Sequence, residues 1–195
     1  HTITSTLAAE VMIATATIGL HANARFHKKY GDRYYKMFTK HIVTQGVTTI
    51  APTLVMELVH AITLTKYTGT HELLDRIAYF IHSEPFRFHC EHVLSILRDF
   101  RTLGHSSNRL FHILLKKQHE LRTCTPTALS YVPYIMGQNV GYLQQKGSED
   151  FLATALDLLA TPGSYKLPTE ARLFRSKDRA WYERLLTELK TRVID

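Results

Sequence analysis

Two short stretches of the chain hold residue types that could carry out chemistry. The first is FHCEH at residues 88–92, in which His89 and His92 are one helical turn apart with Cys90 and Glu91 between them. Imidazole and thiolate groups bind metals, but a zinc site needs three or four converging ligands, and on a helix Cys90 points away from the two histidines. We therefore expect the histidines of a partly buried helix and no bound metal.

The second stretch is HSS, where His105 precedes Ser106 and Ser107 and could act as a base beside a nucleophile. Neighbouring residues at a helix start rarely converge in that way, and we expect Ser106 to cap the helix instead. The chain also lacks the hydrolase, phosphate-loop and metalloprotease motifs and has no C-x-x-C pair. These features predict a protein that is not an enzyme and has no cofactor. The alternative is an active site assembled from titrating groups on distant helices.

The charge of the chain is more informative than these stretches. A formal net charge of +7 favours an acidic partner such as nucleic acid. In the first of two basic blocks, RFHKKYGDRYYKMFTKH at residues 25–41, basic side chains alternate with phenylalanine and tyrosine. Basic groups neutralise phosphates and an exposed tyrosine can stack on a base, so we expect RNA contacts here. The alternative is a solvated helix face with its aromatic residues in the core.

The predicted RNA-binding residues come from both basic blocks. In the first block they are Arg25, Lys28, Lys29, Arg33, Lys36 and Lys40. In the second block they are Arg98, Arg101, Arg109, Lys116 and Lys117. If equivalent helices of successive units line one surface, the two blocks form a single basic stripe.

Composition and length indicate an ordinary folded protein. Of its 195 residues, 45% are hydrophobic and 21% charged, which suits one domain or one array of small units. The two cysteines make no disulfide framework and favour a reducing compartment. The longest uncharged run, residues 125–145, is polar and interrupted by proline and glycine, so no membrane span is expected. The sequence starts at His1 rather than Met, so we expect residues upstream of it.

Apolar residues recur with the period of an α-helix along most of the chain. The predicted helices are 3–20, 32–45, 52–67, 71–82, 87–103, 107–122, 126–145, 149–160 and 177–193. Gly46 and Pro52 are predicted to end one helix and to start the next, and Pro133 to kink its helix. The predicted fold class is therefore all-α.

The helices also repeat in pairs. A shift of 36 residues places Leu58 on Leu94 and Leu74 on Leu110, and it places the expected cap Thr70 on Ser106. We interpret this as tandem helical hairpins stacked as a short α-solenoid, because one hairpin cannot bury its apolar face alone. The predicted organisation is about four hairpins in residues 1–160, then a linker and a capping or docking helix in residues 161–195. The alternative is a helical bundle without repeats.

One hairpin carries a family resemblance. The stretch EHVLSILRDFRTLGHSSNRLFHILLKKQ resembles the degenerate helical-hairpin repeats of organellar RNA-binding proteins, the heptatricopeptide and octotricopeptide class, which are related to the repeats of FAST-kinase-like proteins. The matching residues are Leu94, Leu97, Phe100, Leu103, Gly104, Leu110 and Phe111. No RAP-like segment accompanies them. The resemblance implies a mitochondrial or plastid protein that binds RNA, or a subunit of a large organellar ribonucleoprotein, and it carries over no catalytic residue.

The expected function is thus that of a non-catalytic, helical-repeat subunit of a mitochondrial ribonucleoprotein, in the ribosome or in RNA processing or editing. Its expected partners are RNA (ribosomal, messenger or guide) and other protein subunits, with no membrane. The alternative is a protein scaffold without RNA contact, for which residues 125–145 offer an uncharged surface. Another organelle or the cytoplasm is the alternative to a mitochondrial location.

Overall fold

The computed structural model describes residues 3–19, 31–65, 67, 69–137 and 140–160. Over these residues the protein is helical, with ten α-helices, two 3₁₀ turns and no strand. The predicted all-α class is confirmed. The chain divides into two compact units, residues 1–117 and 118–195.

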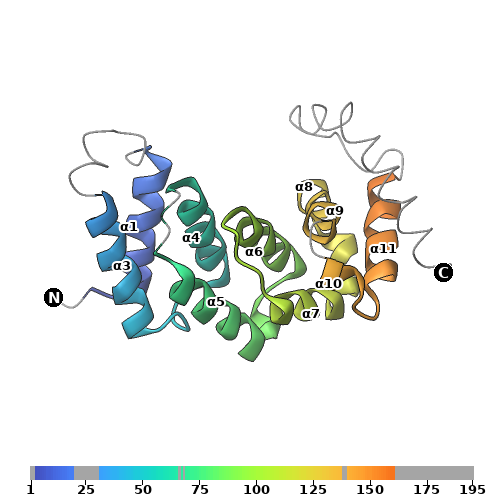
Figure 1. Ribbon diagram of the computed structural model, residues 1–195, viewed down its shortest axis with the longest axis horizontal. Coiled ribbons are helices and arrows are strands. Elements are labelled where there is room, and N and C mark those ends of the chain that lie inside the picture. The colour runs from blue at the N-terminus through green and yellow to red at the C-terminus, as the bar shows by residue number, and fades with distance from the viewer. Residues whose placement is uncertain (1–2, 20–30, 66, 68, 138–139, 161–195) are drawn as a thin grey trace. The chain divides into compact units, whose positions relative to one another are not determined.

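The first unit contains two rows of helices (Figure 1). We call the members of one row the first helices: α1 (Ser5–Thr17), α4 (Pro52–Thr65) and α6 (Cys90–Thr102). The members of the other row are the second helices: α3 (Asp32–Gln45), α5 (His71–Ser83) and α7 (Asn108–Lys116). Within each row, helices that follow one another pack together. Helix α4 packs on both α1 and α6, and α5 packs on both α3 and α7. The rows are joined where α1 packs on α3 and α6 on α7, and a short 3₁₀ turn, η3 (Pro85–Arg87), follows α5.

Local signals begin and end these helices. Helix α3 ends before Gly46, whose φ of 93° suits glycine, and α4 begins at Pro52, both as predicted. The N-cap of α7 is Ser107, whose Oγ accepts a hydrogen bond from the backbone N–H of Leu110 at 3.3 Å. The expected cap at Ser106 is therefore wrong by one residue, because Ser107 has the extended backbone that a capping hydroxyl requires.

Buried positions repeat along each row of helices. Helix α6 starts 38 residues after α4. At that shift five buried residues of α4 fall on buried residues of α6: Val55, Leu58, Val59, Ala61 and Ile62 on Val93, Ile96, Leu97, Asp99 and Phe100. Helix α7 starts 37 residues after α5. The helix starts are thus spaced by 38 and 37 residues, against the predicted shift of 36. A difference of one residue turns a helix face by roughly 100°.

Neighbouring second helices run in the same direction. At their starts, the rings of Tyr35 in α3 and Tyr67 before α5 have centroids 6.0 Å apart. At their ends, Nη1 of Arg87 donates a hydrogen bond to the carbonyl of Thr48 at 3.0 Å. The pair α5 and α7 shows the same relation, since the ring of His105, just before α7, lies 5.9 Å from that of His71.

The second unit is built from shorter helices. They are η4 (Gln118–Thr123), α8 (Pro126–Leu129), α9 (Tyr131–Met136), α10 (Val140–Leu143) and α11 (Ser148–Ala160). Helix α11 packs on η4, α8, α9 and α10, and Nε2 of Gln118 donates a hydrogen bond to Oγ1 of Thr154 at 3.0 Å. The predicted helix 126–145 is broken into three. The first break follows Leu129, whose carbonyl receives no hydrogen bond from Pro133 because proline has no N–H, and the second follows Met136, where Gly137 ends α9. The predicted helix 177–193 and the segment 161–195 lie outside the described residues.

His105 joins the second hairpin to the third through a partly buried ring. The ring packs edge-on against Phe100 at 4.8 Å between centroids, and its Nε2 lies 3.4 Å from Oδ1 of Asp75. Burial lowers the pKa of His105 below its ordinary 6.5; the Asp75 carboxylate opposes this shift and His71 adds to it. Asp75 is well exposed, so water screens its attraction.

This environment predicts a stability that depends on pH. Because the folded pKa of His105 is lowered, the unfolded chain binds the proton more readily, and stability falls as the pH drops below about 6.5. Between about pH 7.5 and about pH 5.5, the range in which histidine changes its charge, we expect the thermal midpoint of His105→Phe to fall less than that of the wild type. Circular dichroism measures the midpoint. His112→Phe, at an exposed position of α7, is the matched control and should keep the wild-type pH dependence.

Candidate functional site

The structure distributes the predicted RNA-binding residues over both rows of helices. Arg25, Lys28 and Lys29 lie outside the described residues. Three residues are exposed on α3 and two on α7, in chain order Arg33, Lys36, Lys40, Arg109 and Lys116. Lys117 is buried directly after α7, and both Arg98 and Arg101 are partly buried on α6, a first helix.

The exposed side chains of the second helices fall at matching positions. Counted from the first residue of each helix, the second, fifth and ninth residues are exposed in all three, on one side of the helix. In the order α3, α5 and α7, the second residues are Arg33, Glu72 and Arg109. The fifth residues are Lys36, Asp75 and His112. The ninth residues are Lys40, Tyr79 and Lys116. We call this surface the second-helix face.

The second-helix face is basic but not uniformly so. Five of its nine residues are lysine or arginine and two are acidic, and both acidic residues, Glu72 and Asp75, belong to the middle helix α5. The expected basic stripe is therefore interrupted at the second and fifth positions. At the ninth position Lys40 and Lys116 flank an exposed tyrosine, Tyr79, whose exposed fraction is 61%.

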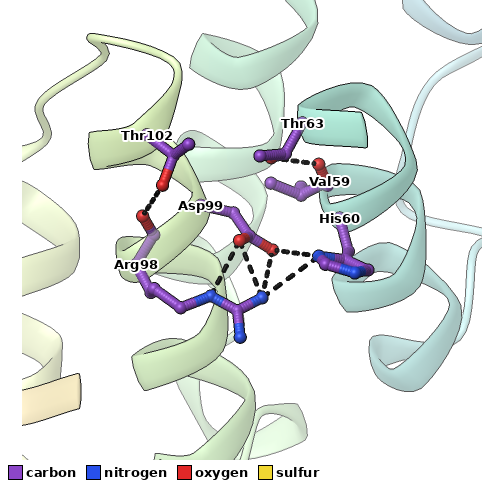
Figure 2. A network of polar contacts seen from close by, with 6 residues as sticks. All are labelled: Val59, His60, Thr63, Arg98, Asp99 and Thr102. Carbon is purple, nitrogen blue, oxygen red and sulfur yellow. Dashed lines mark hydrogen bonds and ion pairs between the residues drawn. The ribbon is translucent and has the colours of Figure 1, made fainter. Parts of the chain in front are cut away.

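A polar network around the buried carboxylate of Asp99 links two first helices (Figure 2). The carboxylate of Asp99 in α6 is almost fully buried and accepts hydrogen bonds from Nε and Nη2 of Arg98, each at 2.8 Å. From α4, Nδ1 of His60 lies 3.3 Å from Oδ2 of Asp99 and 3.1 Å from Nη2 of Arg98. Asp99 stands where the previous first helix has Ala61, so a core-facing position holds a charge that Arg98 compensates.

The tautomer of His60 decides which of these two contacts is a hydrogen bond. In a neutral imidazole, a ring nitrogen either carries a hydrogen and donates a hydrogen bond, or carries none and accepts a hydrogen bond. Nδ1 of His60 therefore either donates to Asp99 or accepts from Arg98. In both tautomers the ring is fixed from one side, and α4 is joined to α6 through polar groups.

This network forms part of a cleft of about 470 Å³ that crosses α1, α4 and α6. Ile13 of α1 and Met56 and Leu64 of α4 give it an apolar lining. Glu57 and His60 of α4 add polar groups, and the Arg98–Asp99 pair contributes from α6. Ile13, His60 and Arg98 are each the ninth residue of their helix, so the first helices are also in register.

The two stretches that suggested chemistry have structural roles. The imidazole Nδ1 of His89 accepts a hydrogen bond from the Glu91 backbone, and Nδ1 of His92 accepts one from the His89 backbone, which caps α6. In the described part of the chain no three His, Cys, Asp or Glu side chains could hold a metal ion. Ser107 caps α7, while His105 packs on Phe100.

Sequence reasoning missed Tyr79, His60 and Asp99 as surface and cleft residues. Tyr79 lies among apolar residues of its helix, a pattern that predicts a position in the core. Its exposure is recognised only when the starts of the three second helices are aligned. Asp99 is a charged residue, for which sequence alone predicts exposure, and its burial depends on Arg98 and His60.

Comparison with known proteins adds no family. No protein-family model, curated protein or solved structure matches the chain. Among the described helices, none has the length and apolar character needed to cross a bilayer.

The buried pair predicts a non-additive effect of substitution. Asp99→Ala removes the carboxylate that compensates Arg98 in a poorly hydrated place, so we expect unfolding in urea to show a loss of about 1–3 kcal/mol. Because Ala61 fills the equivalent place in α4, the double variant Arg98→Gln/Asp99→Ala should recover part of that loss. A double variant whose loss equals the sum of the single losses would contradict the coupling.

Proposed function

We propose that the protein is a non-catalytic RNA-binding subunit of an organellar, mitochondrial ribonucleoprotein, and that its first unit is a short α-solenoid of three hairpins. Support for the solenoid comes from the two rows of helices, the coinciding buried positions and the shared direction of neighbouring second helices. The organelle rests on the resemblance of residues 91–118 to organellar repeats.

A single observation carries the RNA proposal: Lys40, Tyr79 and Lys116 occupy the same place on three adjacent second helices, and all three are exposed. Adjacent helix axes lie about 8–10 Å apart, so the lysines flank the tyrosine on both sides. A single strand crossing the helices meets a cation, an aromatic ring and a second cation. Lysine attracts phosphate and tyrosine stacks on a base, the two contacts that single-stranded nucleic acid offers in every sequence.

The rest of the second-helix face agrees with this use. Arg33 and Lys36 on α3 and Arg109 on α7 extend the basic surface toward the helix starts. Glu72 and Asp75 repel phosphate there, so the strand is best accommodated near the ninth positions. We expect a preference for single-stranded RNA without strong base specificity, because stacking and phosphate contacts are shared by all nucleotides.

The RNA proposal is tested with a fluorescent oligouridylate titrated by the full-length protein at several salt concentrations. Lys40→Gln and Lys116→Gln should each weaken binding and lower the slope of log affinity against log salt by about 0.7, the contribution of one phosphate contact on a single strand. Tyr79→Ala should weaken binding by about tenfold with the slope unchanged, whereas Tyr79→Phe keeps the stacking ring and the affinity.

The matched control is Lys146→Gln, which removes an exposed positive charge from the second unit. Its affinity and salt slope should stay close to those of the wild type. Equal effects of Lys146→Gln and Lys40→Gln would mean that net charge alone attracts the RNA. Absence of binding at low salt would reject the function itself.

A further inference from the structure

We propose that the cleft across α1, α4 and α6 binds a short segment of a partner protein in which an apolar side chain lies next to lysine or arginine. This site is separate from the second-helix face and does not depend on RNA binding. It would make the first unit a two-sided adaptor.

The apolar part of the cleft suits a side chain of the partner. Ile13, Met56 and Leu64 line it, and Leu64 keeps an exposed fraction of 42% although it is a large apolar residue. The volume of about 470 Å³ lies in the usual range of ligand clefts, roughly 300–1,000 Å³. An apolar side chain that enters the cleft removes this surface from water, which favours binding.

The charge of the cleft selects a cationic partner. Glu57 lines the cleft, and Glu10, at the same sixth position of α1, is exposed one helical turn before the lining residue Ile13. Within the described part of the chain neither carboxylate has an ion-pair partner. Arg98 does not offset them, because the carboxylate of Asp99 already neutralises it at 2.8 Å.

This arrangement disfavours RNA in the cleft and favours lysine or arginine. The Glu57 carboxylate in the lining repels phosphate and attracts an ammonium or guanidinium group of a partner, and Glu10 on α1 adds to the same negative field. The charge of the first-helix side is thus opposite to that of the second-helix face. The same fold can then hold a basic protein segment on one side and RNA on the other.

The polar floor of the cleft is ordered before a partner arrives. Asp99 and Arg98 hold each other in fixed geometry, and His60 is bound to them from α4 (Figure 2). The partner therefore does not have to order these side chains, which lowers the entropic cost of binding. The ring of His60 is half exposed in the cleft and remains available for a hydrogen bond to the backbone of the segment.

The test is a selection of short random peptides displayed on phage against the full-length protein. The selected peptides are then synthesised, and their affinity is measured by calorimetry. We expect them to share an apolar residue next to lysine or arginine. Glu57→Lys and Leu64→Asp should each weaken their binding by about tenfold or more, and Glu57→Gln should weaken it less.

Two variants on second helices make the same chemical changes at exposed positions and serve as controls. Glu72→Lys and Met37→Asp should leave peptide affinity unchanged. Circular dichroism melting verifies that all variants are folded, which is expected because every changed side chain is exposed. Oligouridylate affinity should be insensitive to Leu64→Asp, so failure of the peptide site and failure of the RNA site are told apart.

Three results would overturn the proposal. The first is a set of peptides that lack basic residues, or whose affinity is unchanged by both Glu57→Lys and Leu64→Asp. The second is displacement of the peptides by oligouridylate, which would make RNA the occupant. The third is a dimer of the protein that Leu64→Asp dissociates, which would make a second copy the occupant.

Discussion

Each second helix of the first unit buries its side chains at the same places along its length, because a pair of helices can cover its apolar stripe only against the next pair. Tyr35, Phe38 and Ile42 of α3 are followed 39 residues later by Leu74, Ile77 and Ile81 of α5, and all six are buried. This packing fixes how each helix is rotated about its axis. The side chains on the exposed side of each helix are therefore aligned as well, so the surface residues have the same register as the buried ones.

The two surfaces that result differ in charge. The second helices expose mainly lysine and arginine, and the exposed charged residues of α1 and α4 are glutamates. The basic residues of α3 and α7 add to one positive field, which Glu72 and Asp75 of α5 reduce. The difference in sign between the two surfaces is the basis on which different partners are proposed for them.

Polar contacts between hairpins add specificity to an apolar core. Asp99 stands in α6 where α4 has Ala61, and it tolerates burial because Arg98 and His60 reach it. His105 likewise contacts Asp75 of the preceding hairpin. Buried polar contacts add little net stability over apolar ones. A different rotation of the helices would, however, separate His60 from Asp99 and His105 from Asp75 and leave these groups without each other. Such contacts distinguish one neighbour from another in a repeated architecture.

The sequence by itself determined the helical class and most helix positions, because the period of apolar residues and the capping residues act within one helix. Helix 32–45 was predicted with the observed bounds, and the stop at Gly46 and the start at Pro52 are confirmed. It also identified the basic residues of α3 and α7. RNA binding and the organellar location remain proposals.

The tertiary structure decided which of these residues share a surface. The exposure of Tyr79 between Lys40 and Lys116, the burial of Asp99 and the cleft beside Leu64 all depend on how one helix is rotated and shifted against the next. That relation is set by packing between residues far apart in the chain, and an error of one or two residues in the repeat shift turns the wrong side of a helix outward. Local periodicity specifies a helix, and long-range packing specifies its neighbours.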